Sequence, residues 1–254
     1  MSTPARPARP ADLQVRPIRY TDHHERWLPT LEALGAATLL EDGPWHLYAL
    51  GSGLLAIHEV PSAHPAVGTT ELGLTVPDLL TLDPVVADRD DVERVDTQAG
   101  PAVRLRAADG MVVDVMAADP ASGSHRRPSD RETPWAVTVR PLWMTPDVPA
   151  ATAGLTVLGL VDRVRSDSGV WADLAASGGG LIGVHQDRST AVVLSFESAD
   201  VAAIAVRFGD RGLRADIVDE SYGRSLRIDD PDGGVELWVN ETMTDFYGYR
   251  RFDG

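Results

Sequence analysis

The chain has 254 residues, of which 43% are hydrophobic, and its formal net charge is −15. It contains no cysteine and no lysine, so disulfides, thiolate nucleophiles and lysine Schiff bases are excluded, and the acidity disfavours nucleic-acid binding. No apolar run reaches the roughly 18 residues of a membrane helix, and no secretory signal is evident, so we expect a cytoplasmic globular protein.

The N-terminal part of the sequence predicts a tail followed by a helix. Residues 1–12 are rich in Pro, Ala and Arg, which is typical of a disordered tail. Residues 22–35 predict an amphipathic helix that ends at Gly35. His23 and His24 are adjacent at the start of this helix, point to different faces, and are both expected on the surface.

An internal repeat organises the chain. The stretch VRPIRYT at 15–21 returns as VRPLWMT at 139–145, and a helix-like segment ending in Leu-Gly follows each copy. Both copies then reach an apolar strand with one histidine, LLAIHEV at 54–60 and LIGVHQD at 181–187. The glycines before these strands are typical of hairpin turns, because no phosphate-binding helix follows them.

Each copy divides again into two units of one strand, one helix and three strands. The second unit of each copy begins with a strand at 69–76 or 191–197. A weak helix interrupted at Pro84 follows the first of these strands, and a clear helix with a glycine end, at 198–212, follows the second. Three strand-like segments close each unit, at 92–98, 102–107 and 111–117 and at 215–221, 224–230 and 234–239. Four such βαβββ units predict an α+β protein with curved sheets around grooves.

The boundaries of the repeats predict two domains. Residues 118–134 are rich in Pro, Ser, Gly and charge, which indicates a linker. The first domain is expected at 13–117 and the second at 135–244, followed by a C-terminal tail at 245–254.

The stretch SLRIDDPDGGVELWVNE at 225–241 resembles the closing hairpin of the vicinal oxygen chelate superfamily, which includes glyoxalases, bleomycin-resistance proteins and extradiol dioxygenases. Its DPDG turn, formed here by residues 230–233, precedes a strand that carries Glu236 and Leu237. The repeated βαβββ unit is also similar to that family. The resemblance implies two glyoxalase-like domains, each a pair of βαβββ modules whose curved mixed or antiparallel sheets form a groove.

The resemblance also implies where a metal could bind, because the ligands of the family lie in the first and fourth strands of a module. The first-strand positions fall at Val15, Glu71, Val139 and Val193, and the fourth-strand positions at His58, Asp114, His185 and Glu236. Modules could pair in order, so that one groove holds His58, Glu71 and Asp114 and the other His185 and Glu236. They could also exchange, which would combine His185 with Glu71 and Asp114, and His58 with Glu236.

Two functions follow from the resemblance. One imidazole and two carboxylates could hold one divalent metal (Fe, Mn, Zn or Ni) in a lyase, isomerase or dioxygenase that acts on a small oxygenated molecule, with Glu71 as catalytic base. The alternative is a metal-free protein that binds or sequesters a small molecule, as antibiotic-resistance members do, with Trp143, Trp171 and Trp238 lining the grooves. We expect a monomer or homodimer and no nucleic-acid or membrane partner.

Overall fold

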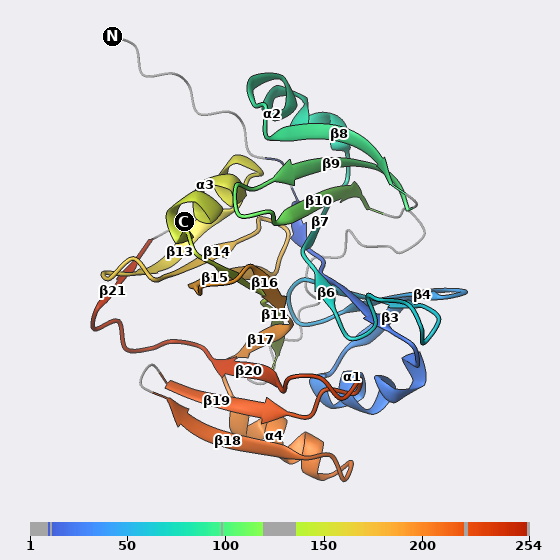
Figure 1. The fold of residues 1–254 in the computed structure, drawn as a ribbon. Coiled ribbons are helices and arrows are strands. Elements are labelled where there is room, and N and C mark those ends of the chain that lie inside the picture. Colours follow the sequence, from blue (N-terminus) through green and yellow to red (C-terminus); the bar gives the residue numbers. More distant parts are fainter. Residues whose placement is uncertain (1–9, 11, 98, 119–135, 221–222, 253–254) are drawn as a thin grey trace.

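The computed structural model describes residue 10 and residues 12–97, 99–118, 136–220 and 223–252. The expected N-terminal tail and linker therefore lie almost entirely outside the described residues. Four βαβββ modules follow one another along the chain, coloured from blue to red in Figure 1. None of the described helices is both long and apolar enough to cross a membrane.

The first half of the chain contains modules 1 and 2, with the bounds that follow. Module 1 consists of β1 (Gln14–Val15), β2 (Ile18–Thr21), η1 (His24–Arg26), α1 (Leu28–Leu34), β3 (Ala37–Asp42), β4 (Trp45–Ala49) and β5 (Leu54–Glu59). Module 2 consists of β6 (Thr70–Glu71), β7 (Gly73–Val76), η2 (Leu79–Leu82), α2 (Asp83–Asp88), β8 (Val92–Thr97), β9 (Gly100–Arg106) and β10 (Val112–Ala117).

The second half repeats this order. Module 3 consists of β11 (Val137–Val139), β12 (Leu142–Thr145), α3 (Val148–Val157), β13 (Val161–Ser166), β14 (Trp171–Ala175) and β15 (Leu181–Gln186). Module 4 consists of β16 (Ala191–Val193), β17 (Ser195–Ser198), α4 (Val201–Gly209), β18 (Ala215–Glu220), β19 (Gly223–Ile228) and β20 (Leu237–Glu241). The expected C-terminal tail contributes one more strand, β21 (Tyr249–Arg251), which pairs with β13.

Local signals explain where the helices begin and end. Asp147 and Asp200 cap α3 and α4, because each carboxylate accepts a hydrogen bond from a backbone N–H at 2.9 Å. Gly35 ends α1 in the left-handed conformation, with φ of 76°. The predicted helix at 22–35 is split, because Trp27 separates the short η1 from α1, and α1 carries proline in its first turn.

The described strands form four sheets, one for each module. The first strand of every module is divided into two short pieces, and the first piece joins the sheet of the neighbouring module. In the first half, β1 joins the sheet β1-β7-β10-β9-β8 of module 2, while β6 joins the sheet β3-β4-β5-β2-β6 of module 1. In the second half, β11 pairs with β17 and β16 pairs with β12 in the same way. Modules therefore pair in order, one with two and three with four, and the exchanged alternative is not what the chain adopts.

The two halves meet through two matching aspartates on hairpin turns. Asp232, in the turn before β20, accepts hydrogen bonds from Arg19 at 2.8 Å and Trp27 at 3.2 Å of module 1. Asp109, in the turn before β10, accepts hydrogen bonds from Trp143 at 2.9 Å and from Thr145 at 2.6 Å of module 3. The turn of each last module is thus held by the first module of the other half.

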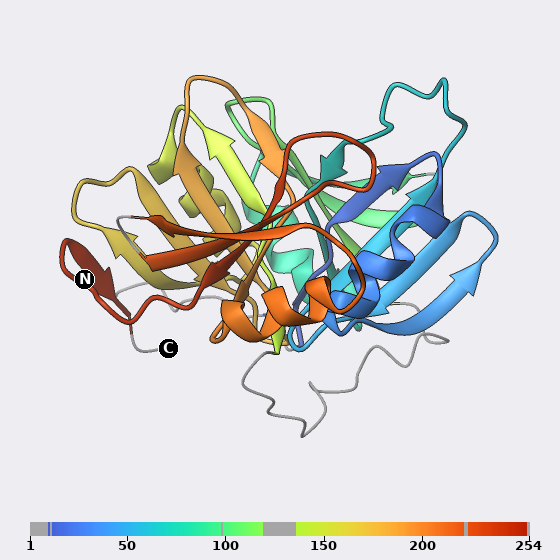
Figure 2. The ribbon, with the colours of Figure 1, turned by 90° about the horizontal axis from the view of Figure 1, so that it is seen from below.

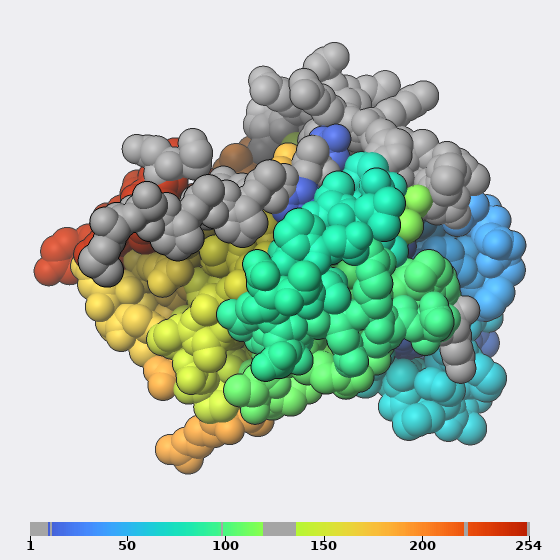
Figure 3. All heavy atoms as spheres, turned by 90° about the horizontal axis from the view of Figure 1, so that it is seen from above, coloured from blue at the N-terminus to red at the C-terminus, as the bar shows by residue number. Residues whose placement is uncertain are grey.

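Helices reinforce the same contacts between halves. Arg207 of α4 donates to the backbone oxygens of Ala33 and Glu32 at the end of α1, both at 2.7 Å, and the two helices lie side by side in Figures 1 and 2. On the other side, Gly154 of α3 packs on Leu105 of β9. In Figure 3 the green surface of module 2 lies directly against the yellow surface of module 3.

The predicted glycine hairpins also touch each other. Ser52, in the turn between β4 and β5, forms a bridge with Thr138 of β11. In the same turn, Gly53 is in close contact with the backbone of Gly180, and the two glycines have φ of 81° and 85°. A side chain on Gly180 would place its Cβ 2.6 Å from the Cβ of Val15, so this close approach requires glycine.

Candidate functional site

The first groove face is the side of the module 1 and module 2 sheets that faces away from the helices. Residues such as Leu55 of β5 and Val113 of β10 belong to the main core with the helices, so their neighbours Ala56 and Asp114 face the other way. This alternation places a row of polar and aromatic side chains across both sheets. The row, called the polar row below, consists of Trp45, His58, Tyr20, Glu71, Asp114 and Arg104.

Aromatic contacts form the module 1 end of the polar row. Tyr20 and Trp45 are the cross-strand neighbours of His58 on β2 and β4. The imidazole lies between their rings, with centroids 5.4 Å from Tyr20 and 5.6 Å from Trp45, and the contact with Trp45 is edge-to-face. The Tyr20 hydroxyl donates to Glu71 at 2.9 Å, which joins the aromatic end to the carboxylates.

The module 2 end of the polar row is a bidentate ion pair. Arg104 donates to both carboxylate oxygens of Asp114, at 2.7 and 2.6 Å, and the two residues are directly opposite on β9 and β10. Glu71 has a neutral hydroxyl as its hydrogen-bond partner instead of a cation. The negative charge on Glu71 is therefore the one that the polar row leaves available to a ligand.

Burial and charge shift the pKa values within the polar row. Burial, together with the nearby His64, holds the pKa of His58 below its ordinary value, although Glu71 acts in the opposite direction. The imidazole is therefore neutral at pH 7. Burial and the charge of Glu71 raise the pKa of Tyr20, so its hydroxyl remains a hydrogen-bond donor.

The floor beside the polar row is apolar. Leu47, Leu54 and Ala56 are at most 3% exposed and form a cluster separate from the main core, with Leu39 and Leu40 packed against it. The polar row therefore lies beside a closely packed apolar cluster, at whose edge Leu39 and Leu40 remain partly exposed.

The residues predicted as metal ligands in this groove do not fit a bound metal as the structure places them. Module pairing does bring His58, Glu71 and Asp114 to the same face, and the charge of Glu71 acts on His58. However, Arg104 takes both oxygens of Asp114. Across the described part of the chain, the one group of three ligand residues with atoms within 4.8 Å of one another lies elsewhere.

The second groove face differs from the first at equivalent positions. His185 again lies between strands beside Trp171, with ring centroids 5.9 Å apart, but Met144 occupies the position of Tyr20 and Val193 that of Glu71. Asp114 lies opposite Gly73 of β7, and the counterpart of Gly73 in the second half is Ser195 of β17. Trp238 lies opposite Ser195, so Trp238 occupies the position of Asp114. Glu236 lies two residues earlier and forms ion pairs with Arg214 and Arg227 at 3.4 and 3.9 Å.

The floor of the second groove face is ionic. Asp173 and Glu197 are 1% and 5% exposed, and both bind Arg163, at 2.7 and 2.6 Å, and Arg140. The first half carries Leu47 and Thr75 at the positions of these two carboxylates. The two floors are thus equally buried, but the second is held by ion pairs and the first by apolar packing.

The tryptophans predicted to line the grooves have different surroundings. Trp171 and Trp238 lie on the second groove face, each with a guanidinium over its ring, from Arg140 at 5.3 Å and Arg227 at 5.4 Å. Trp143 does not line a groove as predicted, because it is fully buried on the helix side of β12, where its ring N–H donates to Asp109 of the first half. Trp45, which the sequence prediction left out, is the tryptophan of the first groove face.

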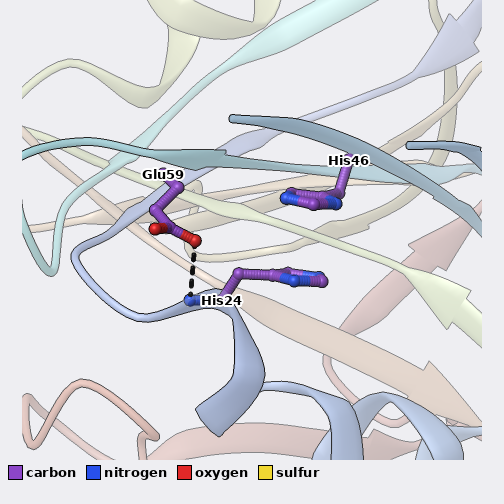
Figure 4. Close-up of side chains that lie close together, drawn as sticks. All are labelled: His24, His46 and Glu59. Carbon is purple, nitrogen blue, oxygen red and sulfur yellow. Dashed lines mark hydrogen bonds between the residues drawn. The ribbon is translucent and has the colours of Figure 1, made fainter. Parts of the chain in front are cut away.

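A second cluster lies on the helix side of the module 1 sheet. His24, His46 and Glu59 offer ligand atoms within 4.8 Å of one another, and Figure 4 shows the two imidazole rings stacked above one another beside the carboxylate. The expectation that His24 is on the surface is wrong, because it is 8% exposed and packs under β4. Its neighbour His23, which precedes η1, is exposed as expected, so the two histidines do point in different directions.

Comparisons with known proteins confirm the predicted fold. The anaerobic substrate complex of homoprotocatechuate 2,3-dioxygenase from Brevibacterium fuscum with 3,4-dihydroxyphenylacetate has a TM-score of 0.62 at 16% identity, covering 94% of this chain and 83% of that chain. The same enzyme from Arthrobacter globiformis has a TM-score of 0.60 at 16% identity, with 93% and 80% covered.

Another match is an extradiol ring-cleaving dioxygenase from B. fuscum, with a TM-score of 0.60 at 15% identity, covering 93% of this chain and 74% of that chain. No family model and no curated protein matches the sequence. The chain therefore has the α+β fold of these extradiol dioxygenases, as its sequence predicted, while its activity has to be argued from its own residues.

Proposed function

We propose that the first groove face binds a small organic cation with an apolar or aromatic body, without a metal in the groove. The observation that supports this best is Glu71, a carboxylate beside an apolar floor whose hydrogen-bond partner is the neutral Tyr20 hydroxyl. A ligand amine would find there a carboxylate of the polar row that is hydrogen-bonded to a hydroxyl, whereas Asp114 forms a bidentate ion pair with Arg104.

The remaining groups suit the body of such a ligand. Tyr20, His58 and Trp45 form a row of aromatic rings that begins at Glu71. The partly exposed side chains of Ile18, Leu39 and Leu40, which pack on the buried apolar cluster, supply apolar contact. The dioxygenase of similar fold holds a dihydroxyphenylacetate. A ligand with such a carboxylate would be repelled by Glu71, so we expect this chain to prefer the opposite charge.

The protein would act by sequestering its ligand rather than by transforming it. Chemistry of the dioxygenase type is not proposed for this groove, because the predicted ligands are bound to Arg104 and Tyr20 instead of converging on one point. The net charge of −15 adds a favourable field for a cation approaching from solution.

Isothermal titration in a buffer with chelator tests this proposal. A panel of aromatic amines and quaternary ammonium compounds is compared with aromatic carboxylates of the same size. We expect members of the cationic set to bind and the anionic set to fail. The variant Glu71→Gln keeps the shape but removes the charge, and we expect it to lose about 1–2 kcal/mol, or roughly 5- to 30-fold in affinity.

The matched control is Glu236→Gln, which removes a carboxylate from the second groove face, where it already pairs with Arg214 and Arg227. This variant should bind like the wild type. Binding that appears only after a divalent metal is added, or a preference for the carboxylates, would contradict the proposal.

A further inference from the structure

We infer that His24, His46 and Glu59 form a binding site for a divalent transition metal such as Zn²⁺, outside both groove faces. The three residues come from η1 and from adjacent strands β4 and β5, on the side of the module 1 sheet that packs against α1. Their ligand atoms lie within 4.8 Å of one another. Two imidazole nitrogens and one carboxylate oxygen are a ligand set that suits Zn²⁺, Ni²⁺ and related ions.

The cluster already has the outer hydrogen bonds that metal sites use. The Nε2 atom of His24 lies 2.6 Å from the Tyr48 hydroxyl, which fixes the orientation of the ring and leaves its Nδ1 for another partner. Glu59 is anchored by the backbone N–H of His24, which donates to it at 3.3 Å, the contact drawn as a dashed line in Figure 4.

His46 supplies independent support for a ligand. Its Nδ1 atom is buried and has no hydrogen-bond partner. A buried polar atom without a partner is costly, and a bound cation would satisfy a lone pair on this atom. His46 is thus stacked face to face on His24 with one of its polar atoms left unsatisfied.

The stacked geometry defines what metal binding would change. The imidazole planes are 3° from parallel with centroids 3.5 Å apart, and nitrogen lone pairs lie in the ring plane. One ion can accept both lone pairs only if the rings tilt towards it, so binding should open the stack. A hollow of about 440 Å³, whose lining includes Asp22, His23 and Glu59, reaches the carboxylate of the cluster from the surface.

Titration of the full chain, without a histidine tag, with ZnCl₂ tests the inference. We expect one Zn²⁺ per chain. The variants His46→Ala and Glu59→Gln should each lose more than about 100-fold in affinity, because even the outer partners of metal ligands contribute 10- to 100-fold. Tyr48→Phe, which removes such an outer partner, should lose about 10- to 100-fold.

Two controls keep the result specific. His64→Ala removes an exposed histidine of the loop after β5, and Glu71→Gln removes the carboxylate of the polar row; both should bind Zn²⁺ like the wild type. Glu59→Gln preserves the size of the side chain, so a loss of binding there, with an unchanged circular dichroism spectrum, reports the ligand and not misfolding.

A second readout follows the histidines directly. Ring protons of the stacked pair should shift in the NMR spectrum when Zn²⁺ is added, because each ring leaves the ring current of the other. Failure of the wild type to bind stoichiometric Zn²⁺, unchanged affinity in His46→Ala, or loss of binding in Glu71→Gln would each overturn the inference. These outcomes are independent of whether the first groove face binds an organic cation.

Discussion

Replacing Arg19 with alanine should destabilise the whole molecule, because this side chain joins the two halves. Arg19 is 4% exposed; its Nη2 donates to Asp230 at 2.7 Å and its Nε to Asp232 at 2.8 Å. The side chains of the two aspartates are only 2% and 1% exposed. The variant would leave two carboxylates in the domain boundary without their cation.

The size of the effect follows from this burial. Removing one partner of a buried ion pair costs about 3–5 kcal/mol, because the remaining charge stays desolvated. At about 2–4 °C per kcal/mol for a chain of this size, the melting temperature should fall by roughly 6–20 °C. The stacking of Arg19 on Trp27, with the guanidinium 5.3 Å from the ring centroid, would be lost as well.

Urea denaturation and calorimetry of Arg19→Ala measure this change, and Arg106→Ala is the matched control. Arg106 pairs with Glu93 at 2.6 Å, but their side chains are 55% and 47% exposed, so its removal should cost about 0–1 kcal/mol. A loss of less than about 1 kcal/mol in Arg19→Ala would refute the view that this contact couples the two halves.

Three further predictions test the polar row and the domain boundary. Glu71→Gln should lower the pKa of His58 further, because the lost charge favoured the imidazolium, and an NMR titration reporting no change or a rise would contradict their proximity. Trp143→Phe should cost about 1.5–3 kcal/mol in urea, since the charged Asp109 loses a donor, whereas a neutral effect would mean that water replaces it. Gly180→Ala should cost at least about 1 kcal/mol, because the added methyl would lie 2.6 Å from the nearest side chain at a φ of 85°; unaltered thermal unfolding would rule this out.

Much of the fold could be predicted from the sequence, because the repeated modules contain similar short stretches and similar glycines at turns and helix ends. Gly35 ends α1 as the sequence predicted, and α4 forms in the segment where the sequence predicted a helix. The DPDG turn does form a turn, in which the backbone N–H of Asp232 donates to Asp230 at 2.9 Å. The role of these aspartates between domains was not predictable, because their partner Arg19 lies 211 residues away from Asp230 in the chain.

The site was less predictable, because strand register and side-chain pairing decide it. The resemblance assigned Glu236 to the ligand position in the fourth strand of its module. In the structure Trp238, two residues later, lies opposite Ser195 of β17 at that position. Asp114 was expected to ligate, but the residue directly across the ladder is an arginine. His24 and His46 meet only after β4 folds over η1, and the one available sequence signal was the density of histidine in module 1.

The contacts of Asp109 and Asp232 connect the four modules in a ring, in which each module contacts the next and the last contacts the first. Module 1 pairs with module 2, module 2 holds module 3 through Asp109, module 3 pairs with module 4, and module 4 returns to module 1 through Asp232. A peptide connection between the halves raises their local concentration without supplying any of these contacts. We therefore expect two fragments produced by a cut within residues 119–135 to bind each other, because the contacts of Asp109 and Asp232 do not depend on that connection. Each half is in this sense a specific binding partner of the other.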